Sequence, residues 1–215
     1  MVISGNKTAK EILKQDPFIE FKKDSHEYFD VKSKRKVPRT ITSLKGGMAF
    51  INKFVEEGIK RGNAVHEACH IYVETKDAGL AYIHAGKYKK YVENFINADF
   101  WKNWDVVVSE FMLIDRNWAI AGTLDLILQH KETGELVLAD IKTGRNPQNV
   151  KMQLGGYAYM LTSNYKEIKI DWCQVIFVHE DKCYRKRYEH FDCWTEFEAC
   201  RSLYYKNLNW QNNTD

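Results

Sequence analysis

The chain has 215 residues, of which 44% are hydrophobic and 28% are charged, as is ordinary for a soluble globular protein. Its formal net charge is only +3, which excludes a protein that binds polyanions over its whole surface and leaves room for a local basic patch. A chain of this length is expected to fold as one domain, residues 1–215, with ample size for a hydrophobic core.

The cysteines point to a reducing compartment. They are odd in number and show no paired C-x2-C spacing, and the sequence has no signal peptide and no apolar run of about 18 residues. We therefore expect a cytoplasmic protein with free thiols and no membrane contact. The five cysteines are Cys69, Cys173, Cys183, Cys193 and Cys200.

The first 104 residues predict helices and a β-hairpin that precede the main sheet in the chain. Residues 1–45 predict a short helix at Thr8–Gln15 and a β-hairpin with the basic tip Lys32–Lys36. That tip is either a solvated turn or a contact for phosphates, since a projecting basic loop can hold a nucleic-acid backbone without reading its sequence. Residues 46–104 predict helices, at Phe50–Lys60, Asn63–Thr75 and Ala85–Phe100, with a break at Gly58 and Gly62.

A run of apolar, β-branched segments follows and predicts the sheet itself. Short polar turns join the segments, which is typical of an antiparallel meander. The three expected strands are Val106–Ile114, Ala119–Gln129 and Glu135–Thr143.

Charged residues interrupt these apolar strands. The period of two puts Asp140 and Lys142 on one face of the third strand, while its apolar neighbours face a core on the other side. Asp125 lies in the middle of the second strand. Charged side chains are costly to bury unless they have partners, and a shared divalent cation would supply one.

Carboxylate ligands suit Mg²⁺ or Mn²⁺ and not zinc. Such an ion can activate water and stabilise charge on a phosphoryl oxygen, and Lys142 would lie beside it to position water or hold the phosphate. Thr143 and Arg145, which leave the strand directly afterwards, are further candidates for holding phosphates.

The last third of the chain predicts a helix, a hairpin and a second helix. In the helix Gln148–Leu161, Gln153 and Tyr157 share a face because they are four residues apart. Gly155 and Gly156 weaken that helix, which makes sense where a backbone or a ligand approaches closely. A strand pair, Lys169–Val178 with Cys183–Tyr188, and a C-terminal helix in residues 191–215 complete the prediction.

The segments GTLDL, ADIKTG and QLGGYAYML resemble the PD-(D/E)xK nuclease superfamily, in its RecB-like branch, which includes phage-type exonucleases. Asp125 matches the motif II aspartate, Asp140 and Lys142 match the (D/E)-x-K, and Gln153 and Tyr157 match the Q-x3-Y. Glu110 resembles the acidic residue of the preceding strand, and RGNAVHEACH is similar to the family's G-x3-H helix, with His66 as its histidine.

The resemblance implies an α/β fold with a restriction-endonuclease-like core, in which helices flank a central mixed β-sheet. Residues 105–190 would hold the sheet and the Q-x3-Y helix. The implied metal ligands are Asp125, Asp140, Glu110 and His66, with Mg²⁺ or Mn²⁺ as the cofactor. Gln153 and Tyr157 would contact the substrate or buttress the site.

The implied function is a metal-dependent DNA exonuclease of phage or prophage origin that acts in DNA processing or recombination. Its partners would be DNA ends and a single-strand annealing or recombination protein, in the cytoplasm of a bacterial host. An oligomer is compatible with the motifs, since ring-forming and monomeric relatives share them.

Several alternatives stay open. An endonuclease of the same fold shares the site chemistry, and a non-catalytic module that binds nucleic acid could keep the fold. HEACH, from His66 to His70, matches the zinc-protease pattern H-E-x-x-H, although no third ligand is evident nearby. An iron–sulfur cluster, known in some RecB-like nucleases, is disfavoured because the tight cysteine spacing is missing.

Overall fold

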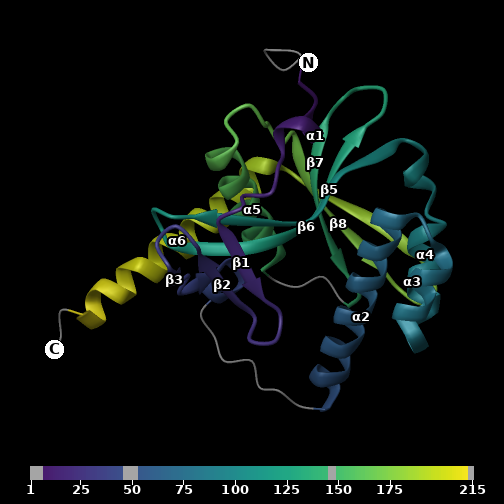
Figure 1. Ribbon diagram of the computed structural model, residues 1–215, viewed down its shortest axis with the longest axis horizontal. Coiled ribbons are helices and arrows are strands. Elements are labelled where there is room, and N and C mark those ends of the chain that lie inside the picture. Colours follow the sequence, from purple (N-terminus) through teal and green to yellow (C-terminus); the bar gives the residue numbers. More distant parts are fainter. Residues whose placement is uncertain (1–6, 46–52, 145–148, 213–215) are drawn as a thin grey trace.

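The computed structural model describes residues 7–45, 53–144 and 149–212. Within these residues, six strands form a mixed sheet at the centre of the protein (Figure 1). The strands are β4 (Arg39–Thr40), β5 (Trp104–Asp115), β6 (Ile120–His130), β7 (Leu136–Lys142), β8 (Trp172–Val178) and β9 (Cys183–Tyr188).

The connections of the sheet follow the predicted meander. Strands β5, β6 and β7 are successively antiparallel, β8 runs parallel to β7, and β9 returns antiparallel to β8. The first turn is built by Asp115, whose carboxylate accepts hydrogen bonds from the N–H groups of Asn117 and Trp118 at 2.9 and 3.1 Å. The second contains Gly134, whose φ of +74° is unstrained only in glycine. The predicted α/β class with a mixed sheet is confirmed.

Helices cover both faces of the sheet (Figure 1). One face carries α1 (Ala9–Ile12), α5 (Val150–Asn164) and α6 (His190–Asn212). The other carries α2 (Lys53–Thr75), α3 (Ala78–Ala85) and α4 (Lys89–Ile96). Three 3₁₀ turns link these parts: η1 (Ile41–Lys45), η2 (Gly86–Tyr88) and η3 (Asp99–Lys102).

Strand β7 contributes to the cores on both faces. Leu136 and Leu138 pack in the core beneath α5 and α6, whereas Val137, Ala139 and Ile141 pack in the core beneath α2 and α4. A strand that is buried on both faces leaves no solvated side for a charged residue. Asp140 and Lys142, at the carboxyl end of this strand, therefore need partners supplied by the fold.

Two helix predictions are wrong in part. The predicted break at Gly58 and Gly62 is absent, because α2 runs unbroken through both glycines from Lys53 to Thr75. Each glycine costs about 1 kcal/mol relative to alanine, and burial of the apolar face of α2 outweighs that cost. The predicted helix Ala85–Phe100 is shorter in the structure, where α4 spans only Lys89–Ile96. Before it, Gly86, with a φ of +54°, caps the end of α3 at Ala85.

The glycine pair in α5 explains how α5 and α6 pack. A Cβ atom on Gly155 would lie 2.0 Å from the carbonyl oxygen of Cys193, so the two helix backbones touch there. A Cβ atom on Gly156 would meet Ile41 at 2.6 Å and Phe197 at 3.0 Å. The close approach expected at this pair is therefore made by the backbone of a neighbouring helix.

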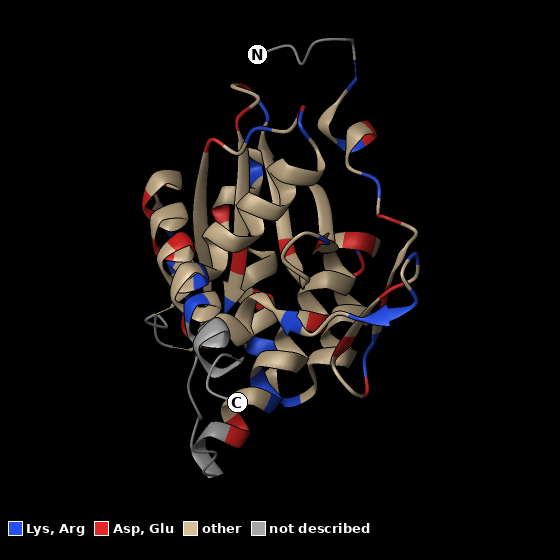
Figure 2. Ribbon diagram, turned by 90° about the vertical axis from the view of Figure 1, so that its left-hand side faces the viewer, with Lys and Arg blue, Asp and Glu red and all other residues tan. Residues whose placement is uncertain are grey.

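A small antiparallel sheet packs beside β5 and β6. It consists of β1 (Ile19–Lys22), β2 (Glu27–Asp30) and β3 (Arg35–Lys36), the last of which is the blue arrow at the edge of the molecule in Figure 2. Tyr28 anchors it, with its hydroxyl 2.8 Å from that of Thr123 on β6. Arg116, in the β5–β6 turn, adds ion pairs to Asp16 and Asp30, both at 3.0 Å.

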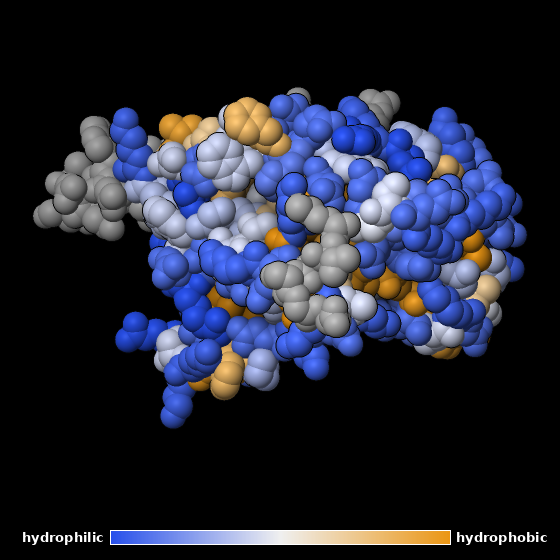
Figure 3. Space-filling model, turned by 90° about the horizontal axis from the view of Figure 1, so that it is seen from above, coloured by the Kyte–Doolittle hydropathy of each residue, from blue (hydrophilic) through white to orange (hydrophobic). Residues whose placement is uncertain are grey.

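The face of the protein shown in Figure 3 is mostly hydrophilic, with separate small groups of hydrophobic residues. Within the described residues, no helix combines the length and the apolar character that crossing a membrane requires.

Candidate active site

The site forms where β6 and β7 separate. Pairing between these strands extends only to Leu126 and Ala139, and β7 then continues from Asp140 to Lys142 paired with β8 alone. The carboxylate of Asp125 fills the fork, because its Oδ2 accepts a hydrogen bond from the N–H of Ile141 at 2.6 Å. If pairing between β6 and β7 had continued, a backbone carbonyl of β6 would have accepted this hydrogen bond, and the Asp125 carboxylate takes its place.

Glu110 lies across from Asp125 on the other neighbouring strand. Ser109 pairs with Leu126 and Phe111 with Leu124, which puts Glu110 opposite Asp125. The φ of Glu110 is +47°, a left-handed conformation that is uncommon for a residue with a side chain. Such conformations persist only where the surrounding structure holds them, and they gather at functional sites.

Helix α2 supplies an imidazole to the same place. The Nδ1 atom of His66 lies 3.5 Å from Oδ2 of Asp125. His66, Glu110 and Asp125 each offer one ligand atom, and these three atoms all lie within 4.8 Å of one another. In the described part of the chain, no other group of three histidines, cysteines or carboxylates comes as close together.

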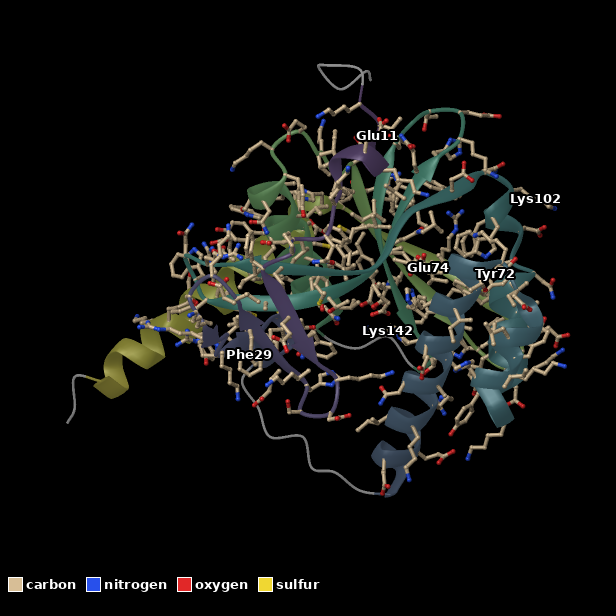
Figure 4. All side chains as sticks on the ribbon, in the orientation of Figure 1. Glu11, Phe29, Tyr72, Glu74, Lys102 and Lys142 are labelled. Carbon is tan, nitrogen blue, oxygen red and sulfur yellow. The ribbon has the colours of Figure 1, made fainter. Side chains whose placement is uncertain are left out.

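Asp140 and Lys142 form a pair beside this cluster. Lys142 Nζ lies 2.5 Å from Oδ2 of Asp140, which is almost fully buried, and neither carboxylate oxygen accepts a hydrogen bond of good geometry from a described residue. Figure 4 shows Lys142 at the end of the sheet, between α2 and the β1–β2 hairpin in that view. A buried carboxylate that keeps one oxygen, Oδ1, without a partner among the described residues suits the neighbourhood of a cation.

The pKa values reflect the crowding of charge. Burial raises the pKa of Asp140 and the Asp125 carboxylate raises it further, while Lys142 opposes both. Burial alone would lower the pKa of Lys142, but the attraction of Asp140 and Asp125 outweighs it and raises that pKa. Glu110 is exposed, but the protein atoms around it remove part of its contact with water, and this raises its pKa to about 7. The nearby Asp125 carboxylate adds to the shift.

The Q-x3-Y residues lie under the site. Gln153 and Tyr157 are both buried, and Gln153 hydrogen bonds to Tyr157. The ring of Tyr157 packs on Gly122 of β6, where a Cβ atom would come within 2.7 Å of it. Burial, together with Asp125 and other nearby oxygens, raises the pKa of the Tyr157 hydroxyl well above its usual range. Of the two roles that the resemblance implies, this burial favours buttressing over direct substrate contact.

The two remaining substrate candidates differ. Thr143 is buried directly after Lys142, with its hydroxyl 3.8 Å from where a Cβ atom on Gly62 of α2 would lie. Arg145 lies outside the described residues, so its predicted role is not addressed by the structure.

Two contacts at the site carry no local pattern in the sequence. Lys23, in the turn between β1 and β2, pairs with Glu67 of α2 at 3.2 Å and draws the pKa of Glu110 downward. The Nδ1 atom of His70 and the Oγ atom of Ser109 lie 2.6 Å apart, one residue before Glu110 on β5. Both contacts join residues distant in the chain, so only the fold reveals them.

The polar side chains of the motif HEACH point to three different places. His66 faces Asp125 and His70 faces Ser109, while Glu67 faces Lys23. The cysteines do not gather at one point either, since Cys69 packs in the core beneath α2, whereas Cys173 and Cys193 contact each other in the core on the opposite face of the sheet.

The chain also matches a known family. The family model described as the PD-(D/E)XK nuclease superfamily matches residues 73–199, a range that contains the sheet carboxylates and Lys142 and begins after His66. No curated protein matches the chain at a significant level. A solved structure described as the crystal structure of SSO0001 is 14% identical, with a TM-score of 0.32, over 76% of this chain and 75% of that chain.

Proposed function

Because the chain belongs to the PD-(D/E)XK nuclease superfamily, we propose that it is a metal-dependent exonuclease that hydrolyses DNA phosphodiester bonds from an end. The observation that carries the proposal is the cluster of His66, Glu110 and Asp125, whose ligand atoms lie within 4.8 Å of one another beside the Asp140–Lys142 pair.

The residues present fit a divalent cation. Carboxylate oxygens with one imidazole nitrogen suit Mg²⁺ or Mn²⁺, and the buried Asp140 carboxylate, whose Oδ1 has no partner among the described residues, provides a further negative group. His66, Glu110, Asp125 and Asp140 are therefore the proposed ligands. When bound, the ion would lower the pKa of a water molecule and stabilise charge on a phosphoryl oxygen.

The residues around the proposed metal site each have a proposed part in the reaction. Lys142, paired with Asp140, holds a positive charge where the phosphate would lie and stabilises the oxygen that gains charge during hydrolysis. Thr143 and Arg145 are proposed phosphate contacts. Gln153 and Tyr157 are proposed to hold β6 and the Asp125 fork in position from below.

The choice of an exonuclease rests on the resemblance of the motifs to the RecB-like, phage-type branch, because endonucleases of this fold share the same chemistry. In keeping with that branch, we propose that the protein is a single cytoplasmic domain of a phage or prophage, working in DNA processing or recombination, with a single-strand annealing protein as a candidate partner.

The test compares end-labelled linear DNA with covalently closed circular DNA, in Mg²⁺, Mn²⁺ or EDTA. We expect loss of linear DNA only, abolished by EDTA and by Lys142→Ala. The matched control is Lys102→Ala, since Lys102 is also ion-paired, to Asp99 at 2.6 Å, but lies in η3 just before β5, away from the fork. Cutting of the circle would identify an endonuclease instead.

Failure of a folded protein to cut either substrate in any of these metals would overturn the nuclease proposal and favour a binding module. The zinc-protease alternative predicts stoichiometric zinc that depends on His70. The hydrogen-bond distance between His70 and Ser109 argues against it.

A further inference from the structure

Three aromatic rings stack at the edge of the central sheet. Phe177 and Tyr184 have ring centroids 5.0 Å apart and planes inclined by 17°. The ring of His179 lies 5.6 Å from that of Tyr184 with an angle of only 4°. Phe177 and His179 are stacked in turn, at 6.1 Å and 21°. We refer to these three residues as the ring stack.

The strand register places the ring stack beside the candidate active site. Lys142 on β7 pairs with Phe177 on β8, and Phe177 pairs with Tyr184 on β9. Paired residues of adjacent strands have side chains on the same face of a sheet, so Lys142, Phe177 and Tyr184 form a row across three strands. Two strand spacings, about 10 Å in total, separate the ends of this row.

The row changes from buried to exposed along its length. Phe177 is fully buried, whereas Tyr184 is 43% exposed. The turn that carries His179 is held in place, because Asn94 of α4 donates hydrogen bonds to the carbonyl oxygens of His179 and Glu180, both at 3.0 Å. An exposed aromatic ring is thus backed by fixed rings, which limits the freedom that it would lose on binding.

The charge around Tyr184 is suited to a polyanion. Lys186 lies two residues from Tyr184 on β9 and therefore shares its face of the sheet. Arg185 and Arg187 alternate to the opposite face, over the rings of Phe100 and Trp172. The ammonium of Lys182 lies 5.6 Å from the centre of the Tyr184 ring, although Asp181 is 3.9 Å from the same ammonium and offsets part of its charge. Basic side chains on an edge strand also prevent pairing with other strands, but that role does not require an exposed, flat ring.

We propose that Tyr184 is the stacking site for an unpaired nucleobase of the DNA strand whose phosphate lies at Lys142. This inference rests on the proposed function and extends it, because it makes single-stranded DNA, or a frayed end, the substrate that the site holds best. Every base has a π-face, so stacking on Tyr184 secures a strand without regard to its sequence. Lys182, near the Tyr184 ring, and Lys186, on the same face of β9, attract the phosphates of the strand towards the ring stack.

The variants separate ring chemistry from bulk. Tyr184→Leu keeps an apolar cover over Phe177 and His179 but has no π-face, whereas Tyr184→Trp enlarges the π-face. Phe191→Leu is the matched control, because Phe191 is an aromatic residue that is 71% exposed at the start of α6, beyond the end of β9 that lies opposite to Tyr184. Thermal unfolding of each variant identifies any loss of folded protein.

The experiment measures binding and cutting separately. Binding of a short single-stranded oligonucleotide that contains 2-aminopurine is followed by fluorescence in EDTA, where no metal-dependent cutting occurs. We expect stacking to quench the fluorescence with wild type and more strongly with Tyr184→Trp. With Tyr184→Leu we expect no quenching and an affinity about tenfold lower, as for the loss of one stacked base. Phe191→Leu is expected to match wild type.

In Mg²⁺ or Mn²⁺, Tyr184→Leu should raise KM for single-stranded DNA with little change in kcat, and should alter KM for blunt duplex DNA less. Unchanged quenching and KM in Tyr184→Leu would overturn the stacking site while leaving the nuclease proposal intact. A wild-type protein that quenches the fluorescence but never cuts DNA would support the stacking site and overturn the nuclease proposal. A wild type that binds no single-stranded DNA would also overturn the stacking site.

Discussion

His70 Nδ1 and Ser109 Oγ lie 2.6 Å apart, and this hydrogen bond ties helix α2 to strand β5 one residue before Glu110. The backbone of Glu110 takes a left-handed conformation, which costs free energy unless its surroundings hold it. The His70–Ser109 contact is well placed to hold it, because it restrains the preceding residue from the side of α2. In this arrangement His70 acts on the metal cluster only through Glu110.

His70→Ala is therefore expected to weaken Mn²⁺ binding about tenfold without abolishing DNA cutting at saturating metal. The reason is that Glu110 would lose part of its positioning while every proposed ligand is kept. Titration of Mn²⁺ by calorimetry would measure the change. Ser109→Ala should give the same loss, and His84→Ala, an exposed histidine on α3, should give none. A complete loss of activity in His70→Ala would instead mean that His70 touches the reacting groups.

Asp125 is expected to separate catalysis from folding. Asp125→Asn should abolish cutting, because an amide is a poor metal ligand, yet its carbonyl oxygen can still accept the hydrogen bond from Ile141. Asp125→Ala leaves that N–H without a partner, at a cost of about 1–3 kcal/mol. Urea denaturation in EDTA should rank Asp125→Asn as the more stable of the two. The reverse order would contradict the role given to the fork.

Gly155→Ala should destabilise the protein severely, by more than about 3 kcal/mol, because its Cβ atom would lie 2.0 Å from a backbone oxygen of α6 and no side-chain rotation can relieve the overlap. Gly58→Ala is the matched control, since it is also a helical glycine but has nothing closer than 4.0 Å. It should leave stability unchanged or raise it by up to about 1 kcal/mol. Chemical denaturation of both variants decides the matter, and equal stabilities would show that α5 and α6 can move apart.

The Arg116 ion pairs predict a pH-dependent contribution to stability. Burial opposes the charged form of Asp30, but hydrogen bonds from Ser33 and Arg116 outweigh it and lower the pKa of Asp30. A carboxyl group whose pKa is lower in the folded state stabilises the fold above its unfolded pKa of about 3.9, and that stability is lost as the pH falls through the folded pKa. The contribution is therefore complete at neutral pH.

Arg116→Met should accordingly reduce the free energy of unfolding by about 2 kcal/mol at pH 7. The reduction should become smaller as the pH falls from neutral to pH 3, through the unfolded pKa of about 3.9. Chemical denaturation at the two pH values would measure both differences. Arg35→Met, an exposed arginine on β3 of the same small sheet, should change little at either pH. A deficit in Arg116→Met that stays constant down to pH 3 would mean that packing of the side chain, and not its charge, is what stabilises the fold.

The central sheet was largely predictable from the sequence because its cues are local. Alternation and polar turns around Asp115 and Gly134 predict β5, β6 and β7, and their antiparallel order is confirmed. The same alternation places Asp140 and Lys142 together on one face, where they form an ion pair. Gly155 carried a further local cue, since a glycine in a helix predicts close packing, although not which element approaches.

The contacts that complete the site were not predictable, because they join distant segments. The φ of Glu110 depends on the neighbouring strand and on α2, and no residue type near it signals a left-handed backbone. Gly58 and Gly62 predict a helix break from local preference alone, and tertiary packing of α2 overrides it. Tyr184 becomes a neighbour of Lys142 only through a third strand, 42 residues further along the chain.

The hydrogen bond between Asp125 and Ile141 affects which residues would be retained in evolution if DNA cutting were no longer under selection. Position 125 serves the backbone of β7 as well as any metal, so a descendant that had lost activity would still be held to aspartate or asparagine there. Among the described residues, no backbone group depends in this way on the side chain of Lys142, whose ion-pair partner Asp140 is a proposed metal ligand. Among diverged copies of this chain, a retained lysine at position 142 would thus be a better sign of surviving activity than a retained aspartate at position 125.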